Sequence, residues 1–267
     1  MKGSDKTQIY GLLNVISDYC YGYRSPEFNQ NFNFQDDMAS QSADENKDSS
    51  TEKKFVTCDS SRTTINTTKP KSSSLTLDSI ERKIHECKRC PLHSGKTNYV
   101  PGTGVSSPYV LVIGEGPGEE EDKSGLPFVG PAGKLLDKML NAINLDRNVN
   151  CYIANAVKCR PPMNRDPLPE ESLACRSFLD AQIHVLKPKM ILLVGKVSAH
   201  DILQNDYTIA QMRQRLFEYN GIPVVVTYHP SALLRNQELK RPAWEDLKFF
   251  KSKLEEIAPD YNRNFKK

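Results

Sequence analysis

The stretch YVLVIGEGPGEEED, residues 109–122, places a continuous apolar run directly before a loop of glycine and proline. An uninterrupted apolar run of this length is typical of a strand that is buried on both faces of a parallel sheet. Three further runs have the same character: CYIANAV (151–157), MILLV (190–194) and PVVVTY (223–228). Helix-like stretches lie between and after them, at residues 133–143, 169–186, 197–203 and about 243–257. This alternation predicts an α/β fold, a three-layer αβα domain around a central, mainly parallel four-stranded sheet.

The residues that precede this pattern have a different composition. Residues 36–75 are rich in Ser and Thr and carry only isolated apolar side chains, so we expect a disordered linker. Residues 1–35 place apolar side chains at helical spacing, which indicates a short helical docking segment or an ordinary packing face. We therefore expect the folded domain to occupy residues 76–267, after a largely disordered N-terminal extension.

Composition excludes several classes of protein. The mean hydropathy is -0.56, and no run approaches the roughly 18 apolar residues that a membrane-spanning helix needs. The first residues are not followed by the apolar core of a secretory signal, so we expect a cytoplasmic protein. The formal net charge is +3, from 36 basic and 33 acidic residues, so any basic surface must be local.

Four of the seven cysteines have a spacing that suits metal binding. Cys87 and Cys90 form a C-x2-C pair, 68 residues separate Cys90 from Cys159, and 15 separate Cys159 from Cys175. Four thiolates can bind zinc or an iron–sulfur cluster, and spacing alone does not separate these possibilities. Incidental buried thiols are the remaining alternative.

Polar and aromatic side chains follow the predicted strands, where the ligand crevice of a parallel sheet lies. Gly114 and Glu115 begin a tight loop, Asn155 ends the second run, and His229 follows the last one. An Asn side chain offers the adjacent donor and acceptor that a nucleobase edge requires, and the ring of Phe128 could stack on a planar base. Each residue also has an ordinary interpretation: a turn, a local backbone contact, a buried histidine or a core ring.

A phosphate-binding P-loop is excluded. Gly133 and Lys134 resemble the end of that motif, but Phe128 stands where its first glycine is required. Leu135 stands where Ser or Thr must bind magnesium.

Taken together, these features resemble the family-4 uracil-DNA glycosylases, which contain an iron–sulfur cluster. The resemblance extends from about Leu77 to Ile257 and rests on four motifs in order. They are GEGPGEEED (114–122), LPFVGPAGKLLD (126–137), YIANAVKCRPPMNRDP (152–167) and HPSALLR (229–235).

The resemblance implies a 4Fe-4S cluster, in preference to zinc, bound by Cys87, Cys90, Cys159 and Cys175 for a structural purpose. It also implies a base site at Gly114, in which Phe128 stacks on a flipped uracil, Asn155 reads the pyrimidine edge and His229 faces uracil O2. Glu121 is similar to a family residue thought to crowd the base C5 position and so reject thymine.

Glu115 is the expected catalytic carboxylate, together with the catalytic residues Asn155 and His229. Other branches of the superfamily carry a water-activating Asp at the position of Gly116, which has no side chain here. Glu115 would therefore either orient the attacking water or stabilise the sugar cation, and the sequence leaves both open.

DNA contacts are expected around the two later motifs. Leu233, Leu234 and Arg235 would fill the gap left by a flipped base, and Ser231, Lys158, Arg160 and Arg165 would contact phosphates. Core leucines and a solvated basic face are the alternatives.

We therefore predict a monofunctional DNA glycosylase that removes uracil from single- and double-stranded DNA and leaves an abasic site for base-excision repair. The expected protein is a monomer in the cytoplasm of a bacterial or archaeal-type cell, and its N-terminal extension is a candidate for binding a repair or replication protein. The main alternative is a non-catalytic, metal-supported DNA-binding module. A redox protein is disfavoured because the cysteines lack ferredoxin-like clustering. Activity on hypoxanthine or other deaminated bases stays open.

Overall fold

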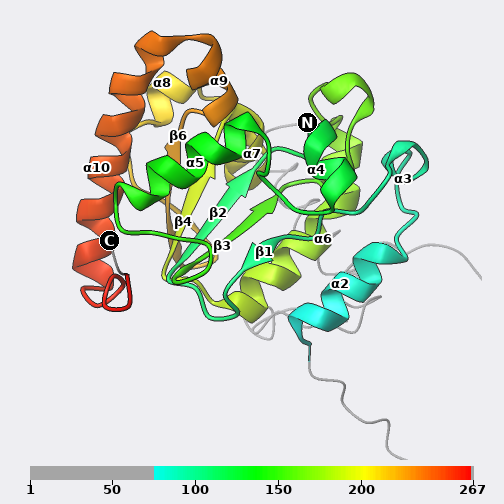
Figure 1. Cartoon of the computed structure of the whole chain (residues 1–267), viewed down its shortest axis with the longest axis horizontal. Coiled ribbons are helices and arrows are strands. Elements are labelled where there is room, and N and C mark those ends of the chain that lie inside the picture. The colour runs from blue at the N-terminus through cyan, green and yellow to red at the C-terminus, as the bar shows by residue number, and fades with distance from the viewer. Residues whose placement is uncertain (1–74, 266–267) are drawn as a thin grey trace, which may run out of the picture. The chain divides into compact units, whose positions relative to one another are not determined.

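The computed structural model describes residues 75–265 (Figure 1). The docking segment expected at residues 1–35 lies outside this range, as does the linker expected at 36–75 apart from its last residue, Leu75. That residue packs against the buried side chains next to the cysteines. Among residues 75–265, no helix is both long and apolar enough to cross a membrane.

A six-stranded sheet in the order β1-β3-β2-β4-β6-β5 forms the centre of the domain. Its four inner strands are the predicted ones and run parallel: β2 (Val110–Gly114), β3 (Cys151–Asn155), β4 (Met190–Val194) and β6 (Ile222–Thr227). The expectation of four strands omitted two short antiparallel edge strands, β1 (Thr103–Gly104) and β5 (Phe217–Tyr219). Both are partly exposed and only two or three residues long, so neither produces a buried apolar run.

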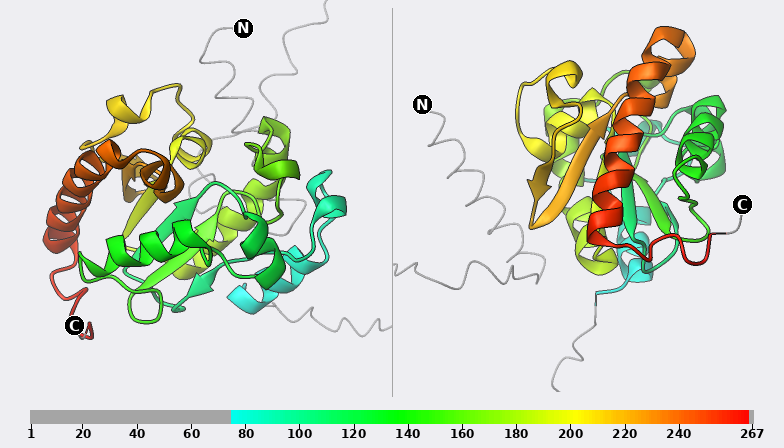
Figure 2. Two further views of the ribbon diagram at one scale, coloured as in Figure 1. Left: turned by 45° about the horizontal axis from the view of Figure 1, so that its top comes forward. Right: turned by 90° about the vertical axis from the view of Figure 1, so that its left-hand side faces the viewer.

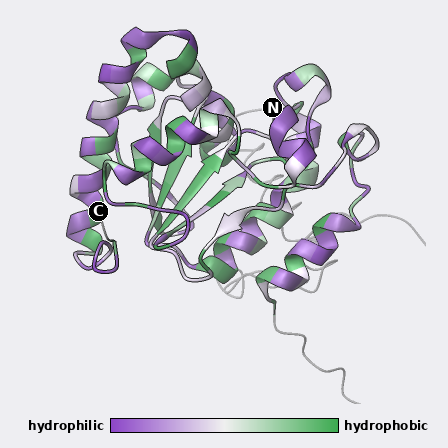
Figure 3. Cartoon of the chain, in the orientation of Figure 1, coloured by the Kyte–Doolittle hydropathy of each residue, from purple (hydrophilic) through white to green (hydrophobic). Residues whose placement is uncertain are grey.

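The three-layer prediction is confirmed, because alternate strand residues pack into separate cores on the two faces of the sheet. Val110 and Val112 of β2 pack against α5 (Pro131–Asn141) and α10 (Lys240–Ile257). Figure 2 shows these two helices beside the sheet. Leu111 and Ile113 face α6 (Pro169–Leu186) and α7 (Lys196–Leu203). Both faces are therefore apolar, which is why the inner strands are mostly green, the hydrophobic colour, in Figure 3.

Shorter elements surround these layers. They are α2 (Leu77–His85), α3 (Leu92–Gly95), α4 (Glu119–Ser124), α8 (Ile209–Met212), α9 (Pro230–Arg235) and the 3-10 turns η2 (Pro162–Asn164) and η3 (Gln237–Leu239). The helix α2 begins where Thr76 and Ser79 form a capping box, and it buries Ile80 and Ile84 one turn apart. These contacts fix the helix that leads into Cys87.

The order of the strands determines where a ligand can bind. The chain passes from β2 to β3 on one side of β2, and then through α6 to β4 on the other side. A parallel sheet whose connections reverse in this way has a crevice beyond the carboxyl ends of the strands at that point. Gly114 and Asn155 are paired there, at the last register positions of β2 and β3.

Candidate active site and cysteine site

A cavity of about 550 Å³ opens at the carboxyl ends of the parallel strands, a volume typical of a small-molecule site. The structure brings into its lining most of the residues expected to bind a base or DNA: Glu115, Glu121, Phe128, Asn155, His229, Ser231 and Arg235. Glu115, Phe128 and His229 lie in loops, Asn155 ends β3, Glu121 lies in α4, and Ser231 and Arg235 lie in α9. Residues far apart in the sequence therefore share one site.

Gly114 lets an aromatic ring and an amide meet at the end of β2. A Cβ atom at this position would lie 2.5 Å from Cζ of Phe128 and 2.6 Å from Oδ1 of Asn155. Such distances are too short for real carbon contacts, so any larger residue would displace one of the two side chains. The ring of Phe128 also lies 5.6 Å from that of His229, centroid to centroid.

The Phe128 backbone has a left-handed conformation, with φ of 55°. This conformation costs an L-residue roughly 1–2 kcal/mol, so the surroundings must stabilise it. Nη2 of Arg147 donates to the Phe128 carbonyl over 3.0 Å, and Nη1 donates to the carbonyl of Pro127 over 2.9 Å. Gly133 of α5 approaches the same carbonyl so closely that a Cβ there would overlap it. The ring position is therefore fixed by both an arginine and a glycine.

Asn155 presents an unsatisfied acceptor. Its side chain is 1% exposed, and within residues 75–265 its Oδ1 atom has no hydrogen-bond partner. A buried acceptor left unpaired costs roughly 1–3 kcal/mol, which a ligand N–H donor could recover. The amide is thus suited to binding a ligand that carries such a donor.

The geometry around His229 identifies which ring nitrogen carries hydrogen. The backbone N–H of Ser231 can only donate, and it donates to Nδ1 of His229 over 3.2 Å. The Ser231 hydroxyl oxygen is 2.8 Å from the same nitrogen. Burial, reinforced by the charge of Arg235, lowers the pKa of His229 to about 4. The ring is therefore neutral at pH 7, with its hydrogen on Nε2.

Glu115 forms a carboxyl pair with Asp166, a residue that the sequence did not single out. Burial raises the pKa of Glu115 to about 7, and the charge of Asp166 and a hydrogen bond to it act in the same direction. Arg235 opposes the shift. Asp166 lies within the third motif, in the segment NRDP. The presence of an acidic residue in that loop was the sequence signal that could have identified it. Glu115 can thus gain or lose a proton near neutral pH.

The Glu121 carboxylate joins two loops of the site. Its Oε1 atom accepts from the backbone N–H groups of Val129 and Gly130 over 3.0 and 3.1 Å. Its Oε2 atom accepts from the N–H of Gly118 over 3.1 Å. The side chain therefore lines the cavity while connecting the loop after β2 to the loop that carries Phe128.

The residues expected to contact DNA differ in their exposure and in their existing partners. Leu234 is 43% exposed on α9 and Arg235 is exposed at its end, but Leu233 is 2% exposed and packs in the core, so it is not available as a wedge. Arg160 is half-buried, 3.5 Å from the Glu119 carboxylate. Arg165 makes two hydrogen bonds to the buried carboxylate of Glu171.

The expected phosphate contact of Lys158 is wrong. The side chain is 1% exposed, and Nζ donates to the carbonyl of Asn155 over 2.8 Å and to Oε1 of Gln182 over 2.7 Å. Burial lowers the pKa of Lys158 to about 8. A basic residue just beyond a strand suggested a surface position, but this one points inward.

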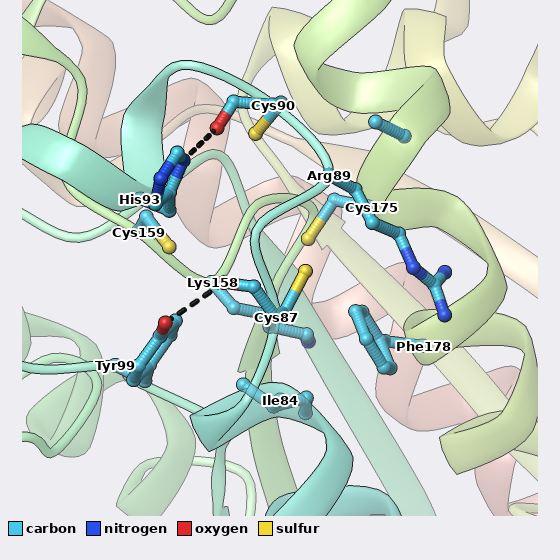
Figure 4. Close-up of a pocket in the computed structure, with 11 residues that line it drawn as sticks. Ile84, Cys87, Arg89, Cys90, His93, Tyr99, Lys158, Cys159, Cys175 and Phe178 are labelled. Carbon is cyan, nitrogen blue, oxygen red and sulfur yellow. Dashed lines mark hydrogen bonds between the residues drawn. The ribbon is translucent and has the colours of Figure 1, made fainter.

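The four predicted cysteine ligands line one cavity. Cys87 and Cys90 follow α2, Cys159 follows β3, and Cys175 lies in α6. Their sulfur atoms point into a common space in Figure 4, and all four are free thiols. The fifth described cysteine, Cys151, lies in the core of the sheet, away from this site.

The four thiols could hold a metal centre, and four thiolates are a donor set for zinc or for an iron–sulfur cluster. Among residues 75–265, no three or more Cys, His, Asp or Glu side chains are grouped closely enough for one metal ion, although the four thiols share a cavity. Ile84, Tyr99 and Phe178 line the same cavity, and the Tyr99 hydroxyl donates to the Cys87 carbonyl over 2.8 Å. The donor set and its apolar surroundings thus suit an iron–sulfur cluster.

A family model and individual relatives both show similarity to uracil-DNA glycosylases. Residues 101–248 match the family model described as the uracil DNA glycosylase superfamily. The chain is 41% identical over 180 residues to a type-4 uracil-DNA glycosylase of Archaeoglobus fulgidus, an alignment that covers 64% of this chain and 90% of that protein.

Sequence identity is higher to a second type-4 enzyme than to a type-5 enzyme. A type-4 uracil-DNA glycosylase of Thermotoga maritima is 42% identical over 180 residues, covering 66% of this chain and 93% of that protein. A type-5 uracil-DNA glycosylase of Pyrobaculum aerophilum is 30% identical over 188 residues, covering 58% of this chain and 83% of that protein. The chain therefore belongs to the uracil-DNA glycosylase superfamily, and within it to the type-4 uracil-DNA glycosylases.

Proposed function

We propose that this protein hydrolyses the N-glycosidic bond of uracil in single- and double-stranded DNA and leaves an abasic site for base-excision repair. One observation carries the proposal: the ring of Phe128, the unpaired Oδ1 of Asn155 and the neutral ring of His229 line one cavity at the strand ends. Aromatic, amide and imidazole groups are what a flat, hydrogen-bonding base requires.

Base selection would depend on Asn155. Uracil carries a hydrogen on ring N3, between its two carbonyl groups, and this N–H can donate to the unpaired Oδ1 of Asn155. Cytosine has no hydrogen on N3, so its binding would leave the buried oxygen unpaired at a cost of roughly 1–3 kcal/mol. Thymine would be excluded sterically, and we assign this role to Glu121, whose carboxylate is fixed by three backbone N–H groups.

Bond breaking places negative charge on the departing uracil and positive charge on the sugar. The neutral ring of His229 would donate from Nε2 to uracil O2, where the negative charge develops. Glu115, in its carboxylate form, would act on the other side of the bond by orienting water or by stabilising the sugar cation.

The target base must leave the double helix before it can reach this cavity, at a cost of a few kcal/mol. The exposed side chain of Leu234 is suited to filling the vacated stack. Ser231, Arg235 and Arg160 line or flank the cavity and would contact the phosphates on either side.

A 4Fe-4S cluster would be held by Cys87, Cys90, Cys159 and Cys175. When bound, the cluster supplies a covalent crosslink between three segments of the chain and takes no part in hydrolysis. Cys159 and Cys175 stand on either side of residues 160–168, which contribute Pro161, Asn164, Arg165 and Asp166 to the base cavity. The crosslink would therefore stabilise one wall of the active site.

A uracil-containing oligonucleotide tests the proposal. The full-length, cluster-loaded protein should release uracil, so that alkali cuts the strand at that position, whereas an oligonucleotide with thymine there should stay intact. DNA binding without base release would instead favour the non-catalytic module. A monomeric state, a cytoplasmic location and recruitment of a repair or replication protein by the N-terminal extension stay predictions.

A further inference from the structure

Lys158 is a buried cation that the proposed reaction does not use. It lies between Asn155, which faces the base cavity, and Cys159, and it lines the cysteine cavity together with all four thiols (Figure 4). Both groups that its Nζ atom contacts, the Asn155 carbonyl and the Gln182 amide oxygen, are neutral. Gln182 is in turn fixed, because its Nε2 donates to the Pro101 carbonyl over 2.9 Å.

A buried charge normally requires an opposite charge nearby, because hydrogen bonds to neutral groups recover only part of its hydration. Three largely buried arginines of the described domain have such partners: Arg176 pairs with Asp201 over 3.0 Å, Arg213 with Asp246 over 2.8 Å, and Arg147 with Asp137 over 2.6 Å. Among residues 75–265, no carboxylate forms an ion pair with Lys158, whereas the side chain lines the cavity that holds the four thiols. Its missing counter-charge therefore lies on the side of the cysteines.

We infer that Lys158 is the internal counter-charge of the cysteine site, where its buried ammonium balances the negative charge of the thiolates and of the cluster they bind. This inference rests on the proposed iron–sulfur site and does not depend on base excision. Four thiolates on a 4Fe-4S cluster leave a net negative charge, which a fixed ammonium stabilises strongly in surroundings that exclude water. The same ammonium also holds the carbonyl of Asn155, so one side chain contacts both sites.

The reduction potential of the cluster tests this role, because it depends on nearby charge and not on catalysis. Lys158→Met removes the charge and retains most of the length, whereas Lys158→Arg retains the charge. In the full-length, cluster-loaded protein, we expect Lys158→Met to shift the midpoint potential to more negative values and to speed iron loss to a chelator. Lys158→Arg should stay near wild type in both measurements.

Lys96 supplies the matched control. Its Nζ atom lies 3.8 Å from the centre of the Tyr99 ring, which also lines the cysteine cavity, but the side chain is only half-buried. Lys96→Met makes the same change in charge where solvent screens it, so the potential should shift much less.

Three outcomes would overturn the inference. The first is an unchanged potential in Lys158→Met. The second is equal iron loss in the Met and Arg variants, which would show that the site needs the shape of lysine and not its charge. The third is a wild-type protein without iron and sulfide. Uracil release is measured separately, so none of these results would decide the proposed function.

Discussion

At the scale of single residues, the site combines groups whose protonation is set by their surroundings. His229 is neutral because burial lowers its pKa to about 4, while Glu115 titrates near pH 7 because burial and Asp166 disfavour its charged form. A neutral imidazole can donate from Nε2 over the whole range in which the carboxylate forms. The two groups therefore change their protonation state in separate ranges of pH.

Replacing His229 by Ala removes the donor to uracil O2. We expect the single-turnover rate of uracil release to fall by about 100- to 1000-fold, the usual effect of losing one such donor. The thermal midpoint should fall modestly as well, because the ring also caps α9, a contact worth about 0.5–2 kcal/mol. His200→Ala is a matched control, because that ring lies on α7 outside the lining of the base cavity, with Nε2 2.7 Å from the carbonyl of Tyr207. Equal rates in wild type and His229→Ala would remove the assigned role.

The Asp166→Asn variant should shift the pH dependence of the reaction. If Glu115 acts as a carboxylate, activity in the wild type rises as pH increases through about 7. Removing the negative neighbour makes ionisation of Glu115 easier, so its pKa falls and the acid limb of kcat/KM moves to lower pH. Asp206→Asn, a change at an exposed position, should leave the profile in place. An unmoved acid limb in Asp166→Asn would contradict the pairing.

At the scale of elements, the active site depends on how closely loops approach helices. The loop of Phe128 reaches its position only because α5 has a glycine, Gly133, against the Phe128 carbonyl. A helix start with Pro131 at its first position supports the same turn, since proline is favoured there. The proline at the start of α5 and the packing of Gly133 against Phe128 therefore favour the same conformation of this loop.

The variant Gly133→Ala tests this packing. Its Cβ would overlap the Phe128 carbonyl, so the loop must move, and we expect a loss of about 1–3 kcal/mol in the free energy of unfolding. Uracil release should fall as well, because the ring shifts with the loop. Gly95→Ala is the control, since no atom lies within 4 Å of a Cβ built there. Chemical denaturation of both variants would show whether the cost is specific to Gly133.

The sequence predicted the inner elements well and the interior polar groups poorly. Long apolar runs identified the four central strands, and the segment of α6 was predicted with its observed bounds. Edge strands of two or three residues have no such signal. Lys158 and Leu233 were expected at the DNA surface, but which face of a loop or short helix points inward depends on tertiary packing. The Glu115–Asp166 pair was missed because it joins two loops, and its members are 51 residues apart in the chain.

At the scale of the whole domain, two cavities share a stretch of chain. Asn155 faces the base cavity, Cys159 faces the cysteine cavity, and residues 160–168 return from there to the base cavity before α6 begins. Glu171 anchors the end of this return, because it accepts from Arg165 and from the N–H of Leu168. One short segment of chain therefore connects the cysteine site to the base site.

Loss of a cysteine ligand should therefore loosen residues 160–168. In Cys175→Ala we expect lower iron content, faster hydrogen exchange in that segment and slower uracil release. Cys151→Ala removes a thiol of similar burial that lies in the sheet core, so it should retain iron and normal exchange in the segment. Unchanged exchange in Cys175→Ala, despite lost iron, would show that the segment does not depend on the cluster.

The pairing of Gly114 with Asn155 has an evolutionary consequence. Because side chains alternate between the faces of a sheet, adding or deleting one residue within β3 would turn the amide away and present Ala154 or Ala156 in its place. A point substitution in the strand changes one side chain, whereas a change in length would abolish base recognition in one step. We expect natural variants of this protein to differ in length in their outer loops and never within β2 or β3.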